Sequence, residues 1–237
     1  LIGLVGSEMC IRDSPGDPNE KLFIKDFNII LNDPEVKVVV ETMGGLHSAY
    51  EFVSACLKAD KSVVTSNKEL VAAKGCELLK YAAQHNVNFL FEASVGGGIP
   101  IIRPISQCLA ANEIDEFAGI LNGTTNFILT KMINDNMAFE DALKLAQDNG
   151  YAERDPSADI LGFDACRKVC ILASLCFGKH VYPEQVHTEG ITEITLEDVD
   201  YAKDWGGVIK LLGRARKSED GKHIYAIVSP AFVNHHS

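Results

Sequence analysis

Apolar and polar positions follow a regular order in the first half of the chain, with short apolar runs between longer helical segments. Three runs rich in valine or phenylalanine have few polar positions, which is typical of strands buried on both faces in a parallel sheet. The predicted elements are a short helix in 26–36, strands in 36–42, 61–68 and 87–95, and helices in 47–60 and 69–86. This order predicts a parallel sheet covered by helices, and the carboxyl ends of its strands are where ligands gather in such sheets.

The pattern changes after Gly98. Helical spacing predicts helices in the next segments, and a C-terminal glycine, Gly150, fits a left-handed helix cap. The predicted elements are helices in 99–112, 124–136, 138–150 and 160–178, a strand in 114–123, and a mixture of strand and helix in 186–195, 197–217 and 223–233. The second half therefore reads as α+β, and two domains are expected to meet near residue 95.

Residues 1–20 show neither the helical nor the strand period, and their glycine, proline, aspartate and serine content predicts a loop. Composition then narrows the class of protein. A net charge of -11 excludes a nucleic-acid partner, because a phosphate backbone requires a basic face. No apolar run reaches the roughly 18 residues that span a bilayer. Seven cysteines without zinc spacing indicate free thiols in the cytoplasm.

The predicted helix from Ile160 onward is apolar on nearly every side, yet it carries Asp164 and Lys168 four residues apart. A solvated surface ion pair is the ordinary explanation of that spacing. Ile160 and other apolar residues share the stripe, however, and buried charges are costly unless they are paired or functional. We therefore expect Asp164, Lys168 and the acidic turn before the helix to face one polar cleft that suits a small zwitterionic substrate.

At this point several motifs together resemble the homoserine dehydrogenase family. The signature residues are Ala146, Gly150, Tyr151, Asp155, Pro156, Asp159, Gly162, Asp164 and Lys168, and the stretches VVVETMGG, VVTSNKELVA, FEASVGGGIPII and GILNGTTNFILT agree in order and spacing. The resemblance runs from about Phe27 to Val233. It implies an NAD(P)-dependent oxidoreductase that interconverts aspartate semialdehyde and homoserine, on the route to threonine, methionine and isoleucine.

The resemblance implies a role for each matching residue. Lys168 is the expected proton donor, and Lys68 is the second lysine beside the nicotinamide and the substrate; alone, Lys68 would read as an exposed loop lysine. Five residues are expected to bind the substrate: Glu153, Asp164, Asp159, Asn122 and Thr124. Helix capping is the alternative for Asp159. A strand-to-helix turn with threonine capping is the alternative for Asn122 and Thr124.

The cofactor, NADP or NAD, is expected along Thr42, Gly44, Lys68 and Gly150, although capping alone also explains Gly150. The family also implies a sodium ion, held by one carboxylate and several backbone carbonyls. Those ligands correspond to Glu92, Val95, Gly97 and Ile99; the alternative is a glycine-rich turn between two domains.

The sequence also departs from the family. It lacks the G-x-G-x-x-G run that opens a dinucleotide-binding fold. The expected fold is thus an incomplete Rossmann-type parallel sheet followed by an α+β domain for substrate binding and dimerisation. Residues 1–20 are expected to be a non-family segment, 21–95 a partial NAD(P)-binding domain and 96–237 the catalytic domain of a homodimer, truncated at both ends. A related semialdehyde dehydrogenase with a cysteine nucleophile, and a non-catalytic dimerisation module or impaired fragment, are the alternatives.

Overall fold

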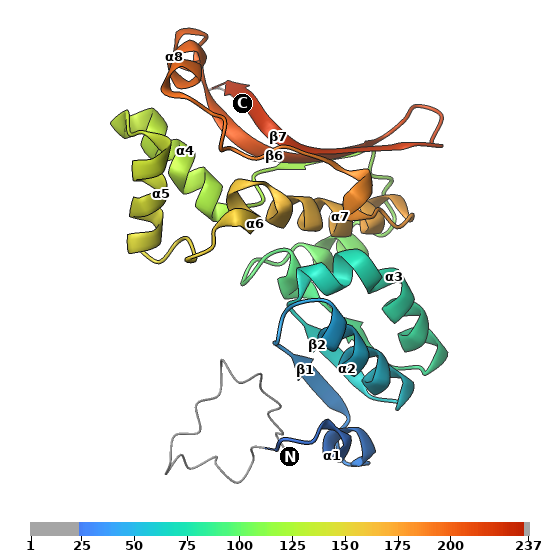
Figure 1. The fold of residues 1–237 in the computed structure, drawn as a ribbon. Helices are drawn as coiled ribbons and strands as arrows, with labels where there is room; N and C mark the ends of the chain where they lie inside the picture. The colour runs from blue at the N-terminus through green and yellow to red at the C-terminus, as the bar shows by residue number, and fades with distance from the viewer. Residues whose placement is uncertain (1–23, 235–237) are drawn as a thin grey trace. The chain divides into compact units, whose positions relative to one another are not determined.

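The computed structural model describes residues 24–234, and the chain divides into two compact units (Figure 1). The first unit extends to Arg103 and the second begins at Pro104, eight residues beyond the predicted boundary at 95/96. The predicted loop at 1–20 lies outside the described residues. Among residues 24–234, no helix is long and apolar enough to cross a bilayer.

The first unit is built on a parallel sheet, as the sequence predicts. Its strands are β1 (Val38–Glu41), β2 (Ser62–Thr65) and β3 (Phe89–Leu90), in the order β1-β2-β3. Val39 pairs with Val63, and Val63 pairs with Phe89. Parallel pairing brings the carboxyl ends of all three strands to one edge of the sheet.

Helices cover one face of this sheet. They are α1 (Phe27–Asn32), α2 (His47–Lys58) and α3 (Lys68–Gln84). Val53 and Leu57 of α2 and Leu70 and Leu78 of α3 are buried. The Asn67 side chain caps α3 by accepting a hydrogen bond from the backbone N–H of Leu70, which satisfies one of the unpaired donors of the first turn.

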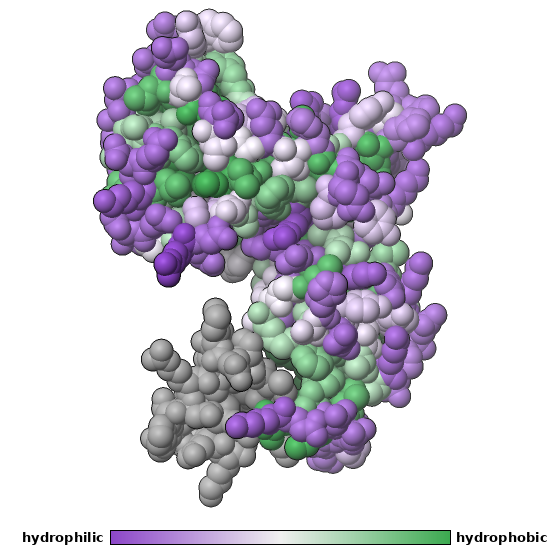
Figure 2. Space-filling view, in the orientation of Figure 1, coloured by the Kyte–Doolittle hydropathy of each residue, from purple (hydrophilic) through white to green (hydrophobic). Residues whose placement is uncertain are grey.

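The prediction that β1 is buried on both faces is wrong for the described part of the chain. Val38 and Val40 are 56% and 64% exposed, and Leu90 of β3 is 54% exposed. Figure 2 shows apolar surface over β1. Successive side chains alternate between faces, and among residues 24–103 no helix packs on the face that carries Val38 and Val40.

The second unit contains a mixed sheet of four strands in the order β4-β6-β7-β5. They are β4 (Glu116–Gly119), β5 (His187–Thr188), β6 (Gly207–Lys217) and β7 (Ile224–Asn234). Helix α7 (Phe163–Phe177) packs on this sheet. A Cβ atom at Gly213 would lie 2.6 Å from a methyl group of Val169, so glycine permits this close approach.

The remaining elements of the second unit are α4 (Gly123–Asp135), α5 (Phe139–Asp148), α6 (Ser157–Ile160), α8 (Leu196–Asp204) and the short turns η3 (Pro104–Cys108) and η4 (Pro183–Gln185); η2 (Glu92–Ser94) belongs to the first unit. Gly150 ends α5 as predicted. Its φ is +74°, and the backbone N–H groups of Gly150 and Tyr151 bond to the carbonyls of Gln147 and Ala146. This is the pattern of a Schellman cap.

Two predicted helices differ from the structure. The predicted helix at 160–178 is interrupted at Gly162, whose φ of +83° is left-handed and separates α6 from α7. The predicted helix at 99–112 is reduced to the single π-turn η3. Pro100 and Pro104 lack the N–H groups that a continuous α-helix would need there.

Candidate active site

Asn122 stands at the N-terminus of α4, directly after the strand β4 and its following turn. Its Oδ1 accepts hydrogen bonds from the backbone N–H of Thr125, at 2.8 Å, and from the Thr125 hydroxyl, at 3.0 Å. Asn122 is therefore the cap of α4. Asn122 is 6% exposed and Thr125 is fully buried.

The Asp164–Lys168 pair lies on α7 as the i,i+4 spacing predicts. Lys168 Nζ is 2.8 Å from Asp164 Oδ2, and the two side chains are 15% and 4% exposed. Lys168 Nζ also donates a hydrogen bond to the backbone carbonyl of Leu121, at 2.8 Å. The pair is thus a largely buried one that ties α7 to the turn before α4, and a solvated surface pair is excluded.

Asp159 of α6 is hydrogen-bonded to Asn122, as Asp164 is. Asn122 Nδ2 donates to Asp159 Oδ1 at 2.6 Å and to Asp164 Oδ2 at 2.9 Å. Asp159 caps neither neighbouring helix, because α6 has Pro156 and α7 has Gly162 at its N-cap position, without side-chain cap bonds. We call Asn122, Asp159, Asp164 and Lys168 the carboxylate–lysine cluster.

This cluster explains why an apolar helix carries charges near its start. Each charged group has a partner of opposite charge or a hydrogen-bond donor, which offsets the cost of removing it from water. Two carboxylates and one ammonium leave the ionised cluster with one net negative charge. Such a cluster attracts a small cationic group, and the Lys168 ammonium can donate a hydrogen bond to an oxygen of a bound ligand.

The other predicted substrate residues do not join the cluster by hydrogen bonds. Glu153 is exposed, and its carboxylate has no hydrogen-bond or ion-pair partner among residues 24–234. The Thr124 hydroxyl donates to the backbone carbonyl of Tyr151 at 2.7 Å, which connects α4 to the loop after α5. Their roles toward the substrate stay predictions.

In the first unit, a buried polar network lies at the carboxyl ends of β1 and β2. Glu41 Oε1 accepts from the backbone N–H groups of Met43 (2.7 Å) and Gly44 (3.1 Å), and Glu41 Oε2 accepts from the Thr65 hydroxyl at 2.5 Å. Thr65 Oγ1 accepts from the backbone N–H of Asn67, and Asn67 Nδ2 donates to the carbonyl of Gly45. This network fixes the two loops that precede α2 and α3.

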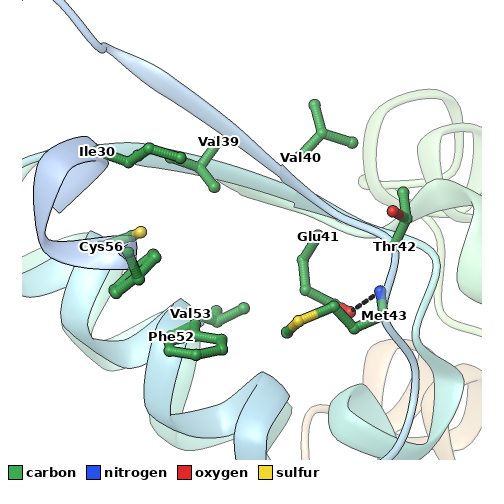
Figure 3. A pocket seen from close by; sticks show the side chains of 10 residues that line it. Ile30, Val39, Val40, Glu41, Thr42, Met43, Phe52, Val53 and Cys56 are labelled. Atoms are coloured by element: carbon green, nitrogen blue, oxygen red, sulfur yellow. Dashed lines mark hydrogen bonds between the residues drawn. The ribbon is translucent and has the colours of Figure 1, made fainter. Parts of the chain in front are cut away.

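The close-up in Figure 3 shows Glu41 turned back toward its own loop, with its bond to the backbone of Met43. A cavity of about 50 Å³ lies beside it, between α1, α2 and β1. Ile30, Val39 and Val53 are among the residues that line it. A space of this size and lining accommodates no nucleotide.

The predicted cofactor residues of this unit lie on those two loops. Thr42 and Gly44 are exposed, and Gly44 has a φ of +76° with no atom within 4 Å of where its Cβ would be. Lys68 is the first residue of α3, directly after its cap Asn67. Sequence reasoning missed Glu41, Thr65 and Asn67 as functional candidates, although their positions at strand ends and before a helix were visible signals.

The predicted sodium ligand Glu92 has other partners. Its Oε1 accepts from the backbone N–H groups of Ile101 and Ile102, and its Oε2 from that of Arg103, at 2.6–2.8 Å. Burial raises the pKa of Glu92, but these hydrogen bonds and the charge of Arg103 outweigh burial and lower the pKa overall. These bonds also tie residues 101–103 to the first unit, which moves the boundary beyond residue 95.

Glu92 therefore fits the sodium site poorly, because only Oε2 keeps an acceptor position. The carbonyls of Val95, Gly97 and Ile99 lie in the turn that follows. The sodium site stays a prediction.

Among the cysteines of residues 24–234, none forms a nucleophile site at the sheet edge. In the described part of the chain, Cys166 and Cys170 are buried on α7 and Cys56 is buried on α2. The hydrogen bond from the Cys170 thiol lowers the pKa of Cys166 to about 7 and raises the pKa of Cys170. Among residues 24–234, no cysteine lies in the loops after β1, β2 or β3, where a semialdehyde dehydrogenase would need one.

Comparison with known proteins places these sites in context. Residues 100–237 match the family model for homoserine dehydrogenase, and residues 3–92 match the model for the homoserine dehydrogenase NAD binding domain. The latter match begins inside the segment 1–20 that the sequence pattern sets apart.

Individual relatives agree with the family matches. The homoserine dehydrogenase of Bacillus subtilis is 44% identical over 92% of this chain and 50% of its own length. That of Pseudomonas aeruginosa is 46% identical over 82% of this chain and 45% of its own length. The chain spans about half the length of the curated relatives it matches.

Solved structures show the same fold. The crystal structure of a homoserine dehydrogenase from Thiobacillus denitrificans superposes with a TM-score of 0.87 at 44% identity, over 92% of this chain and 52% of that one. A hyperthermophilic archaeal homoserine dehydrogenase in complex with NADPH gives a TM-score of 0.75 at 28% identity, over 90% and 60% of the two chains.

Proposed function

The chain belongs to the homoserine dehydrogenase family, and from this we propose that it serves the NAD(P)-dependent interconversion of L-aspartate 4-semialdehyde and L-homoserine. The observation that carries the proposal is the ammonium of Lys168. Two of its three protons go to Asp164 Oδ2 and to the carbonyl of Leu121, and no other acceptor among residues 24–234 takes the third. The partly accessible third proton is the one that would reach a substrate oxygen.

In the reducing direction, the aldehyde carbon gains a hydride and its oxygen becomes an alkoxide that must gain a proton. When bound, NADPH or NADH supplies that hydride. Lys168 donates its proton to the developing alkoxide and stabilises the negative charge before the transfer is complete. Asp164 holds the ammonium in place, because its Oδ2 is 2.8 Å from Nζ. In the reverse direction, neutral Lys168 accepts the hydroxyl proton of homoserine.

The substrate amino group is assigned to the acidic side of the site. Glu153 is exposed and has capacity for an ammonium partner, and Asp159 adds charge from the cluster. Thr124, at the first turn of α4, offers a further polar contact. This assignment follows the family resemblance, and the net negative charge of the cluster supports it.

Thr42, Gly44, Lys68 and Gly150 are proposed to contact the cofactor. The exposed Gly44 supports this, because a left-handed glycine with open space around it allows a ligand close to the backbone. Lys68 supports it as well, since it begins a helix at the carboxyl edge of a parallel sheet. Either NADP or NAD is proposed as the cofactor.

We also propose that the protein is a cytoplasmic homodimer that pairs through its second unit. The face of the β6–β7 sheet that α7 does not cover carries Tyr225 and Ile227, which are 55% and 38% exposed. They lie opposite Arg216 and Arg214 in the register. An exposed mixture of apolar and arginine side chains is typical of a protein interface.

The proposal is tested by homoserine-dependent reduction of NADP and of NAD, measured with the purified chain and with Lys168→Arg. Arginine keeps the positive charge beside Asp164 but does not release a proton near neutral pH. We expect the fold to persist and kcat to fall about 100-fold or more, the range of general acid–base catalysis. Lys131→Arg is the matched control, because Lys131 forms an exposed i,i+4 pair with Asp135 on α4.

Wild-type kcat in Lys168→Arg would refute the role of Lys168. Calorimetric titration with L-homoserine separates binding from turnover, and absence of both in the wild-type chain would contradict the proposed function. Lys168→Ala is less informative, since removing one partner of a buried ion pair costs about 3–5 kcal/mol of stability. Reduction of NADP or NAD with another amino-acid semialdehyde, but not with homoserine, would favour a related dehydrogenase instead.

A further inference from the structure

Every hydrogen-bonding position of the Asn122 side chain is used inside the protein. Its two Nδ2 protons go to Asp159 Oδ1 at 2.6 Å and to Asp164 Oδ2 at 2.9 Å. Its Oδ1 accepts from the N–H and the hydroxyl of Thr125. A side-chain amide offers two donors and two acceptor lone pairs, so Asn122 has no position left for a substrate.

The amide links the start of α4 to α6 and α7, which lie much later in the sequence. Asp159 lies 37 residues and Asp164 42 residues after Asn122, on α6 and α7. The backbone next to Asn122 also holds Lys168, through the carbonyl of Leu121. The cap of α4 thus determines where both carboxylates and the ammonium lie.

The amide also makes the juxtaposition of two carboxylates possible. Two acidic side chains that approach one point repel each other unless a donor lies between them. Asn122 Nδ2 supplies one proton to each, and Lys168 forms its ion pair with Asp164. Without this donor, Asp159 and Asp164 would separate or share a proton, and Asp164 would hold Lys168 less firmly.

We infer that Asn122 is a positioning residue for the proposed reaction: it acts through Asp159, Asp164 and Lys168 and does not contact the substrate. This inference rests on the proposed function and replaces the substrate-contact role that the family resemblance implies for Asn122. Helix capping alone would be a purely structural role, so the test must separate the cap from the two donors.

Two substitutions separate the capping role of Asn122 from its donor role. Asn122→Ser keeps a side-chain oxygen that caps α4 about as well as asparagine, but it removes the Nδ2 donors. Asn122→Asp also keeps the cap and places a third carboxylate between Asp159 and Asp164. The matched control is Asn126→Asp, which adds the same charge one turn later on α4, where the side chain meets the ammonium of Lys210 at 2.8 Å.

The first measurement is the titration of the aspartate carboxyl carbons by NMR, which needs no enzymatic activity. We expect Asn122→Asp to hold about one proton more than the wild type above roughly pH 6, because three adjacent carboxylates cannot all stay ionised. Asn126→Asp is expected to match the wild type. An Asn122→Asp variant without additional proton uptake overturns the inference.

The second measurement is turnover. We expect Asn122→Ser to stay folded but to be less stable than the wild type, because two carboxylates lose a donor, and its kcat to fall about 10- to 100-fold, the cost of a misplaced catalytic group. Wild-type kcat in Asn122→Ser overturns the inference even if the titration agrees. Should the wild-type chain neither bind nor turn over homoserine, the proposed function fails, and the titration alone still decides whether Asn122 holds the carboxylates together.

Discussion

At the residue scale, both units place a buried polar side chain at the end of a strand and surround it with donors or acceptors. Asn122 follows β4 and Glu41 ends β1, and they are 6% and 5% exposed. Buried polar groups persist in proteins where their hydrogen bonds are complete. Each of the two therefore determines the geometry of the loop that follows it.

Glu41 allows a direct test of this role. Glu41→Ala leaves the N–H groups of Met43 and Gly44 and the hydroxyl of Thr65 without their acceptor, so we expect a loss of about 3 kcal/mol in the free energy of unfolding. Glu41→Gln keeps one acceptor oxygen and should lose less. Urea unfolding measures both.

Glu35→Ala is the control for Glu41, because Glu35 is exposed on the loop before β1 and should change stability by no more than about 0.5 kcal/mol. Equal stability losses in Glu35→Ala and Glu41→Ala would show that the buried network contributes little.

At the element scale, α7 carries the Asp164–Lys168 pair and is bounded by two left-handed glycines. Gly162 precedes it and Gly178 follows it, with φ of +83° and +68°. The break at Gly162 turns α6 away from α7, so that Asp159 and Asp164 approach Asn122 from separate helices. A continuous helix would have kept them on one rigid axis.

The two glycines predict a ranked pair of substitutions. Gly178→Ala incurs only the left-handed backbone strain of about 1–2 kcal/mol, because no atom lies within 4 Å of the added Cβ. Gly162→Ala adds contacts of 3.1 Å to Thr188 and 3.2 Å to the carbonyl of Glu189 and should be less stable than Gly178→Ala. Thermal unfolding of both variants checks the order, and the reverse order would contradict the described packing around Gly162.

At the scale of the whole molecule, the fold divides the chemistry between two units. The parallel sheet presents three of the predicted cofactor residues, Thr42, Gly44 and Lys68, at its carboxyl edge, and the second unit holds the carboxylate–lysine cluster between β4, α6 and α7. All four residues of the carboxylate–lysine cluster belong to the second unit.

The proposed homodimer makes a prediction at this scale. Ile227→Glu places a charge on the uncovered face of the β6–β7 sheet and should raise the dimer dissociation constant by about tenfold or more, since interface centres tolerate unpaired charge poorly. Sedimentation equilibrium measures it.

Leu79→Glu provides the matched control for Ile227→Glu, because Leu79 is similarly exposed, at 41%, but lies on α3. A wild-type chain that stays monomeric at all concentrations, or an Ile227→Glu variant that dimerises normally, would exclude this interface.

The sequence by itself determined the order of the elements, the parallel first sheet, the glycine cap of α5 and the Asp164–Lys168 pair. These features depend on local spacing: the strand and helix periods, the left-handed freedom of Gly150, and the single turn that separates i from i+4. The motifs also indicated the family, which the comparisons confirm.

Only the tertiary structure decided which groups meet. Asn122 bridges residues 37 and 42 positions away, and Glu41 binds Thr65 from 24 positions away. No local period encodes such contacts, because they depend on how separate elements pack. The same is true of Glu92, whose carboxylate binds the backbone of residues 101–103, and of Val38 and Val40, whose exposure depends on what covers the sheet. Burial and partnership are properties of the assembled fold, and they support the inference that Asn122 is a positioning residue.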